Sequence, residues 1–267
     1  MTALTFALIA EPPERLDLSP LTPQALAGMS EIEKIRLGTS KRASTVGDLF
    51  RVTGDGAQTI VFEGGSSRFD RVAMGMTEGT VRVVGDVGAQ AGRTMRGGAL
   101  TIEGNAGPHA GSGMRGGRLE ILGNTGDHLG APLAGELAGV NGGVLIVRGR
   151  AGAYAADRMR RGLIAVLNGA GDHAGCRMIA GTLVVLGGAG EMPGYLMRRG
   201  SILLDRAPQD LSPTFVESGA PDSVFAMLVD RHLIAEGIIE QPLLGNAPRK
   251  YGGDNAVLGK GEILLPR

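Results

Sequence analysis

Short alternations of apolar and polar residues recur along the middle of the chain and predict a series of β-strands. Thr80–Val84, Leu119–Leu122 and Leu183–Leu186 all show this pattern. Residues two apart on a strand point to the same face, so the apolar positions of each segment face one core. The first column of such positions comprises Val81, Leu100, Leu119, Leu145, Ile164 and Leu183, and the second comprises Val83, Ile102, Ile121, Val147, Val166 and Val185.

Glycines place these strands at a period of 19 residues, with one longer step between Gly117 and Gly143. The equivalent glycines are Gly79, Gly98, Gly117, Gly143, Gly162, Gly181 and Gly200. Such a period predicts a solenoid, because each unit is too small to bury its apolar face alone. Each internal glycine would cost a helix about 1 kcal/mol, whereas tight corners favour glycine. The predicted fold class is therefore all-β, a right-handed parallel β-helix with about 19 residues per coil.

The segment before the repeats predicts a cap over residues 1–45. It contains a helix candidate over Thr22–Leu37, with Thr22 as N-cap. The alternative is a break at Gly28, after which Ser30 and Glu33 start a second helix. The β-helix itself is assigned to residues 46–205. Its degenerate first coils are expected at Asp48–Val52 and Thr59–Phe62.

The segment after the repeats, residues 206–267, predicts a second cap. We expect a loop over Pro208–Pro221, a helix over Asp222–Glu236 that Gly237 ends, and an extended tail. The open ends of a solenoid expose strand edges, which these irregular segments would cover. The whole chain is then one structural domain.

Composition narrows the function classes. Of 267 residues, 46 are glycine, tryptophan is absent and the formal net charge is zero. A net charge of zero does not indicate binding to nucleic acid or to an anionic membrane, which positively charged proteins favour. No apolar run approaches the roughly 18 residues of a membrane span, so a cytoplasmic protein is expected. The single cysteine, Cys176, excludes an internal disulfide framework.

The glycine-rich turns do not predict a nucleotide site. A dinucleotide fingerprint needs a helix after its glycines, whereas here another strand follows every time. The aspartates and nine-residue period of a calcium-binding repeat are also missing. A buried column of methionines is interpreted as core filling in preference to a redox or metal role. This column comprises Met95, Met114, Met159, Met178 and Met197.

Histidines gather in one column, eleven residues after each repeat start. The column comprises Gln90, His109, His128, Tyr154, His173 and Met192. One interpretation is a metal site or an acid–base pair, with Asp127 and Asp172 orienting the histidines. A contact to a ligand or partner, carried by His109 and His128, and a simple column of turn residues are the alternatives. Histidines spread over several coils cannot all reach one ion, so no metal site and no catalytic residue is predicted.

An arginine column follows the methionines. It comprises Arg96, Arg115, Arg160, Ile179 and Arg198, and a cationic stripe along one edge is expected to include the nearby Arg93, Arg158, Arg161, Arg177 and Arg199. A row of guanidinium groups suits carboxylates and phosphates through bidentate hydrogen bonds. Arginines on a solvent edge can equally serve to keep stacked turns soluble. Arg96, Arg115, Arg160 and Arg198 are therefore candidates for binding a carrier or a partner.

Two copies of the repeat carry a family resemblance. Gly104–Gly116 reads GNAGPHAGSGMRG and Gly123–Gly130 reads GNTGDHLG. These coils resemble the glycine-repeat β-helix that the C-terminal domain of glutamate synthase shares with the C subunit of formylmethanofuran dehydrogenase. The flanking segments resemble that C subunit in particular. The resemblance lies in the opening Leu4–Phe6, the helix start at Leu21–Pro23 and the tail Gly252–Leu264.

The resemblance implies a subunit of a larger enzyme. In methylotrophic bacteria the similar subunit belongs to a formyltransferase/hydrolase complex, which moves a formyl group from tetrahydromethanopterin to a methanofuran analogue and releases formate during formaldehyde oxidation. In methanogenic archaea it belongs to a molybdenum or tungsten formylmethanofuran dehydrogenase. Only four of the 27 basic residues are lysines, a bias that favours a GC-rich bacterial genome and hence the bacterial complex.

The same resemblance implies partners and a role. A formyltransferase subunit, a metal-dependent amidohydrolase-like subunit and a further dehydrogenase-like subunit would surround this chain. This chain would be a non-catalytic scaffold that binds no cofactor of its own. A methanofuran-type or pterin carrier with a polyglutamate tail would suit the arginine column. A stand-alone binding module is the second alternative.

Overall fold

The computed structural model describes residues 2–38, 40, 44–219 and 223–267. Strands predominate over helices, so the all-β class is confirmed. In chain order the elements are β1 (Ala3–Leu8), β2 (Leu16–Asp17), α1 (Pro23–Leu26), the 3₁₀ helix η1 (Ile32–Lys34), α2 (Val46–Leu49), β3 (Phe50–Thr53), β4 (Gly56–Glu63), β5 (Phe69–Asp70), β6 (Thr80–Val84), β7 (Ala99–Ile102), β8 (Arg118–Ile121), β9 (Asn141–Val147), β10 (Arg161–Val166), β11 (Thr182–Val185), β12 (Arg199–Leu204), β13 (Val216–Glu217), α3 (Ser223–Ala235), β14 (Arg249–Gly253) and β15 (Lys260–Leu265).

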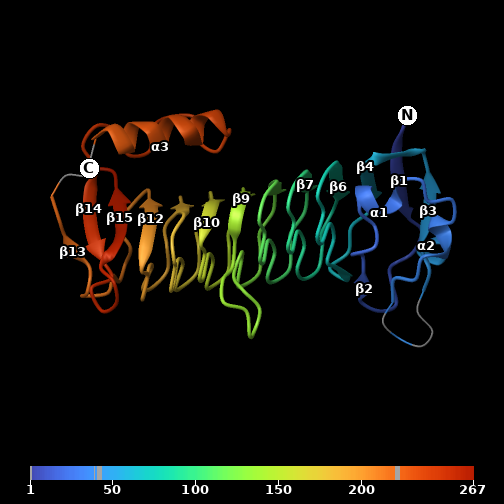
Figure 1. Ribbon diagram of the computed structural model, residues 1–267, viewed down its shortest axis with the longest axis horizontal. Coiled ribbons are helices and arrows are strands. Elements are labelled where there is room, and N and C mark those ends of the chain that lie inside the picture. Colours follow the sequence, from blue (N-terminus) through green and yellow to red (C-terminus); the bar gives the residue numbers. More distant parts are fainter. Residues whose placement is uncertain (1, 39, 41–43, 220–222) are drawn as a thin grey trace.

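One mixed sheet, of 13 strands among the described residues, extends along the molecule (Figure 1). Its order is β13-β14-β15-β12-β11-β10-β9-β8-β7-β6-β4-β1-β3. Every neighbouring pair from β4 to β12 is parallel. Parallel neighbours require the chain to return after each strand, so successive repeats lie side by side.

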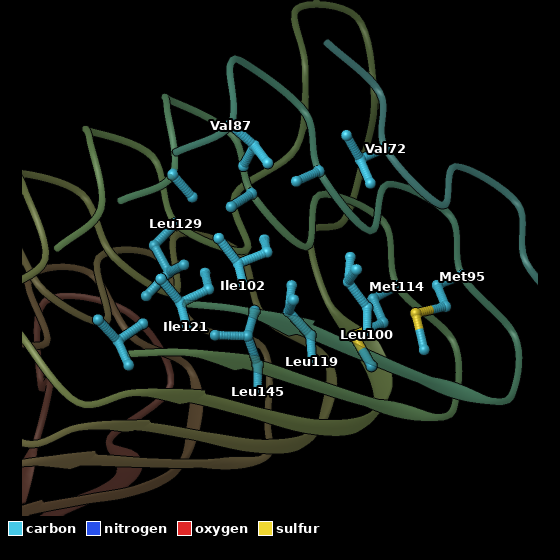
Figure 2. Packing of buried hydrophobic residues seen from close by; sticks show 14 of the residues in the cluster. Val72, Val87, Met95, Leu100, Ile102, Met114, Leu119, Ile121, Leu129 and Leu145 are labelled. Carbon is cyan, nitrogen blue, oxygen red and sulfur yellow. The ribbon is translucent and has the colours of Figure 1, made fainter. Parts of the chain in front are cut away.

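The core lies on the inner face of this sheet. The two predicted inward columns are confirmed, since all their members are at most 1% exposed. Val81 is paired with Leu100, and Leu100 with Leu119, so like residues stack upon one another. Figure 2 shows Leu100, Leu119 and Leu145 in this packing, with methionines filling the space beside them. The methionine column is buried, as its interpretation as core filling requires.

A second line of contacts joins the turns. Isolated parallel bridges link small or apolar residues of successive repeats, namely Val87, Ala106 and Thr125, then Ala151, Ala170 and Ala189. Beside it, side-chain oxygens accept hydrogen bonds from the next repeat. Asp86 accepts from the amide of Asn105 at 2.7 Å, and Asn105 from the amide of Asn124 at 2.8 Å. These bonds satisfy turn amides that a thin core leaves without sheet partners.

Aromatic side chains fill the N-terminal end of the core. β1 lies between β4, to which it is parallel, and β3, to which it is antiparallel. Phe6 stacks on Phe62 at 5.1 Å between ring centroids, and Phe50 and Phe69 complete the buried cluster. β3 is therefore antiparallel to its neighbour and does not form the degenerate coil expected over Asp48–Val52.

The long N-terminal helix predicted over Thr22–Leu37 is wrong. Only Pro23–Leu26 and the short η1 are helical. The alternative of a break at Gly28 is confirmed, since Gly28 adopts a φ of +74° and lies between the two helical segments. Thr22 does precede α1, but its side chain makes no capping hydrogen bond. Burial of Leu26 and Leu37 on opposite sides of this break outweighs helix propensity.

The C-terminal helix is confirmed over the described residues. α3 spans Ser223–Ala235, and Gly237 follows it with a φ of +66°; the predicted start at Asp222 lies outside the described residues. The loop expected over Pro208–Pro221 contains the short strand β13, which pairs with β14. The tail is extended as predicted, and β15 continues the stack by pairing in parallel with β12.

α3 lies along the outer face of the sheet (Figure 1). There the outward residue in the middle of each strand from β9 to β12 is apolar, and a second buried cluster includes these residues, Ile146, Ala165, Val184 and Leu203, together with Leu233 of the helix. On the earlier strands the same face carries exposed polar residues such as Arg82. None of the helices in the described segments has the length and apolarity that crossing a membrane requires.

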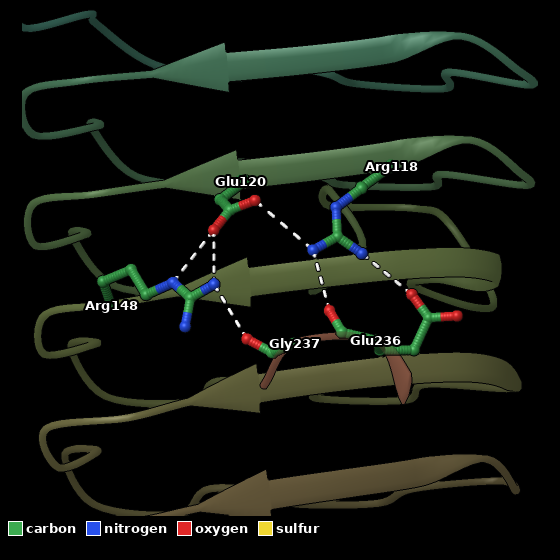
Figure 3. Close-up of polar contacts among 5 residues, drawn as sticks. All are labelled: Arg118, Glu120, Arg148, Glu236 and Gly237. Atoms are coloured by element: carbon green, nitrogen blue, oxygen red, sulfur yellow. Dashed lines mark hydrogen bonds and ion pairs between the residues drawn. The ribbon is translucent and has the colours of Figure 1, made fainter. Parts of the chain in front are cut away.

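Two arginines fasten the end of α3 to the sheet (Figure 3). Arg118 donates to the carboxylate of Glu236 at 2.8 Å and to its carbonyl oxygen at 3.1 Å. Arg148 donates to the carbonyl oxygen of Gly237 at 3.0 Å, and Glu120 bridges the two arginines. Carbonyl groups at the end of a helix lack partners within it and carry partial negative charge, so cations are favourable there.

Candidate functional site

The predicted arginine column lies along one edge of the stack, just before the strands begin. Arg96, Arg115, Arg160 and Arg198 are all exposed. Backbone hydrogen bonds keep this position aligned between repeats. The amide of Arg115 donates to the carbonyl of Met95 at 2.7 Å, and Arg198 makes the equivalent bond at 2.8 Å. The structure therefore brings the four arginines into one row.

Three further cations extend the row. Arg161 and Arg199 each follow a column arginine, and Lys260 is paired in the sheet with Arg199. We call Arg96, Arg115, Arg160, Arg161, Arg198, Arg199 and Lys260 the arginine edge. None of the seven forms an ion pair with a residue that the structure describes. By contrast, Arg82, Arg118 and Arg148 on the outer sheet face all pair with glutamates.

A cleft of about 360 Å³ interrupts the arginine edge. We call it the notch; its lining comprises Arg160, Arg161, Ile179, Ala180, Arg198, Arg199 and Leu258. Ile179 and Ala180 occupy the positions that carry arginines one repeat before and one repeat after. The notch therefore has an apolar floor between two pairs of cations. Guanidinium groups in such pairs suit carboxylates.

The histidine column forms a stacked ladder of rings. The centroids of His109 and His128 lie 4.8 Å apart with 7° between the ring planes. His128 is followed by Tyr154 at 5.3 Å, and Tyr154 by His173 at 5.0 Å. All four residues have φ between 59° and 63°. The structure therefore places His109 and His128 next to each other in the column.

The ladder has little of the geometry of an acid–base site. Asp127 and Asp172 do not orient the histidines as the metal or acid–base interpretation supposed. They accept hydrogen bonds from the amides of Ala153 and Glu191 at 2.8 and 2.9 Å. Burial, with a contribution from neighbouring His128, lowers the pKa of His109. Within the described residues, no group of three or more His, Cys, Asp and Glu side chains is placed to hold a metal ion.

The insertion between β8 and β9 lies across this region. Glu136 pairs with Arg93 at 2.6 Å, and its carbonyl oxygen accepts from Arg158 at 3.2 Å. The Arg93 guanidinium lowers the pKa of Glu136. Leu137, next to it, is 88% exposed. The insertion thus links repeats on both sides of the step that lengthens the period.

Comparisons with known proteins agree on one family. No protein-family model matches the chain. The C subunit of the formyltransferase/hydrolase complex Fhc from Methylorubrum extorquens strain AM1 is 52% identical over 264 residues, which cover 98% of this chain and 99% of that protein. This chain belongs to the Fhc C-subunit family. The structure is also similar to a chain in the crystal structure of the M. extorquens formyltransferase/hydrolase complex FhcABCD with methylofuran. The two chains superpose with a TM-score of 0.93 and are 45% identical, over 98% of this chain and 99% of that one.

Sequence reasoning on this member of the Fhc C-subunit family found the cations of the notch but not the notch itself. It named Arg161 and Arg199 as neighbours of the arginine column, but it did not place them in two pairs around Ile179, which it treated only as an exception in the column. The signal was present, since both Arg-Arg pairs directly precede a repeat glycine. Leu258 could not be found in this way, because only folding brings the tail beside β10 to β12.

Proposed function

We propose that this member of the Fhc C-subunit family is a non-catalytic scaffold subunit of a formyltransferase/hydrolase complex. The complex would transfer a formyl group from formyl-tetrahydromethanopterin to a methanofuran analogue and release formate in formaldehyde oxidation. The observation that carries the proposal is 52% identity over nearly the full length to the C subunit of such a complex. Its companions would be the other subunits of that complex, and formyl transfer and metal-dependent hydrolysis would belong to them.

The arrangement of polar side chains supports the non-catalytic part of the proposal. Nucleophilic and acid–base catalysis require a reactive group within hydrogen-bond reach of a base that a third group orients. Here His109 and His128 stack face to face, and Asp127 is engaged by a backbone amide. The buried thiol of Cys176 has a raised pKa, chiefly because of its burial, which disfavours the reactive thiolate.

We further infer that residues 46–205 form a right-handed parallel β-helix, with residues 1–45 and 206–267 as its caps in one structural domain. Parallel pairing from repeat to repeat, the stacked inward columns and the second line of bridges support this inference. The right hand follows from the rule for parallel crossovers. A body of this kind would hold catalytic partners at a fixed separation.

Along that body we assign carrier or partner binding to Arg96, Arg115, Arg160 and Arg198, with His109 and His128 as additional contacts. Exposure and the absence of ion pairs among the described residues support the arginines. Partial exposure of their flat stacked surface supports the histidines.

Co-purification tests the proposed function. The tagged full-length chain, expressed in its native host, should recover larger companion subunits together with formyltransferase and formate-releasing activity. The isolated chain should release no formate, and His109→Gln and His128→Gln should not abolish turnover in the complex, as they would if either histidine were catalytic. Recovery of the chain alone as a stable monomer would contradict the scaffold role, and formate release by the isolated chain would contradict the non-catalytic role.

A further inference from the structure

The notch is where the arginine edge carries an apolar side chain, Ile179, in place of an arginine. Arg160 and Arg161 lie on one side of it, Arg198 and Arg199 on the other, and all four are exposed. The two pairs stand two repeats apart, or roughly 9–10 Å at the usual spacing of strands. Ile179, between them, is only partly buried by its own chain. The site is therefore a short apolar floor with cations at both ends.

We propose that the notch binds an acidic polypeptide segment of a partner subunit, which places one apolar side chain on Ile179 and carboxylates on the two arginine pairs. This proposal rests on the proposed function, because it needs a partner subunit. In an extended segment, alternate residues point to the same face and lie about 6–7 Å apart. An apolar residue that faces the floor therefore shares its face with the residues two before and two after it, and carboxylates at those two positions would reach the two arginine pairs.

Charge complementarity identifies the occupant as acidic. The notch has no acidic lining residue, and its arginines lack ion-pair partners within the described chain. Four guanidinium groups this close repel one another, and carboxylates relieve that repulsion. Arg93 and Arg177, by contrast, already hold Glu136 and Asp157.

The apolar floor distinguishes this site from a surface that attracts any polyanion. If the edge bound its ligand through charge alone, we would expect arginine at position 179. Arginine occupies the equivalent position one repeat before, at Arg160, and one repeat after, at Arg198. Leu258, which is 47% exposed, adds an apolar wall from the tail. Covering Ile179 and Leu258 with one apolar side chain removes their surface from water, which is favourable in proportion to the area covered.

A peptide-binding experiment with the full-length chain tests the notch. The probe is a fluorescent pentapeptide with leucine at its centre and glutamate at the other four positions, and the matched probe is pentaglutamate. We expect the leucine probe to bind about tenfold more tightly, as covering part of one leucine side chain allows. Ile179→Arg should weaken the leucine probe although it adds a positive charge. The column accepts arginine in other repeats, so this variant is expected to fold.

The controls separate a shaped site from diffuse attraction. Arg160→Ala with Arg198→Ala should weaken both probes, whereas Arg51→Ala, an exposed cation at the far end of the sheet, should change neither. If Ile179→Arg tightened both probes, if pentaglutamate bound as well as the leucine probe, or if neither bound, the proposal would be overturned.

A second measurement identifies the source of the segment. In the native host, the Ile179→Arg chain should recover less of its companion subunits than the Arg51→Ala chain does. Equal recovery would overturn the assignment to a partner subunit and leave the acidic tail of a small carrier as the occupant. Failure of the proposed function is distinguishable, because then the wild-type chain would recover no companions at all.

Discussion

At the residue scale, left-handed backbone recurs at three alternate positions in every regular repeat, and at two in the repeat that the insertion lengthens. His109, Gly111 and Gly113 have φ of 60°, 69° and 64°, and the next full repeat has Tyr154, Ala156 and an arginine in the same conformation. Glycine spacing predicted only the middle position of the three. A side chain in this conformation costs about 1–2 kcal/mol. Hydrogen bonds between neighbouring repeats, such as that from the His109 amide to the Asp127 carbonyl at 3.0 Å, offset the cost.

Alanine substitutions at two glycines distinguish the cost of a positive φ from the cost of a close backbone contact. Gly113→Ala meets no atom nearer than 3.5 Å and should cost about 1–2 kcal/mol from its φ alone. A Cβ at Gly117 would lie 2.7 Å from the carbonyl oxygen of Gly98, also at positive φ. Gly117→Ala should therefore cost roughly 2–5 kcal/mol, since strain and overpacking add. Chemical denaturation of both variants measures the difference, and equal losses would show that the backbone contact is unimportant.

The lowered pKa of His109 predicts a pH effect on stability. The folded state disfavours the protonated ring because of burial and the nearby His128. Its contribution is thus present above the unfolded pKa of about 6.5 and is lost as the pH falls below it. Below that pH, the free energy of unfolding should fall less steeply in His109→Gln than in the wild type. One group can change this slope by at most about 1.4 kcal/mol per pH unit, and we expect only a fraction of that because the ring is only partly buried.

Denaturation series at pH 7 and pH 5 provide the measurement. Glutamine already occupies the equivalent position at Gln90, with a φ of 64°, so the substitution suits the backbone. His232→Gln, on the exposed side of α3, removes a histidine elsewhere and serves as the control. Identical pH slopes for the wild type and His109→Gln would refute the assignment.

At the element scale, the outer face of the sheet decides where α3 lies. In the middle of each strand from β9 to β12 the outward residue is apolar, and the helix covers this row; on β6 to β8 the same row holds Arg82, Thr101 and Glu120. The helix itself was predictable from its sequence and its glycine stop. The position of the helix on the sheet was not predicted. A signal was present, because Leu163 and Val184 are apolar outward residues in strands whose inward residues are also apolar. Strands apolar on both faces are typical of a sheet covered on both sides.

The docked end of α3 yields an element-scale prediction. Arg118→Ala removes charge-assisted bonds to Glu236 and leaves its carboxylate and carbonyl without that partner. We expect a loss of about 1–3 kcal/mol in the free energy of unfolding and faster amide hydrogen exchange confined to α3. Arg82→Ala, which breaks an exposed pair with Glu103, should cost at most about 1 kcal/mol. Unchanged exchange in α3 of Arg118→Ala would contradict the anchoring role.

At the scale of the whole molecule, the chain combines zero net charge with an uneven distribution of charge. Ion pairs neutralise the arginines on the outer sheet face, while those of the arginine edge have no such partners among the described residues. The net charge of the whole chain therefore does not reveal the arginine edge, the surface to which we assign carrier or partner binding. Attraction along such an edge acts within about one Debye length, roughly 10 Å at 0.1 M salt.

The sequence by itself determined the repeat, the inward columns and the row of arginines. Each follows from a local period that parallel stacking translates directly into a spatial column, as the buried Leu100 and Leu119 demonstrate. Only the tertiary structure decided the short N-terminal helix, the covering of the outer face by α3 and the wall that Leu258 adds to the notch. Those features depend on contacts between segments far apart in the chain, whose burial outweighs local propensity and leaves no periodic signal.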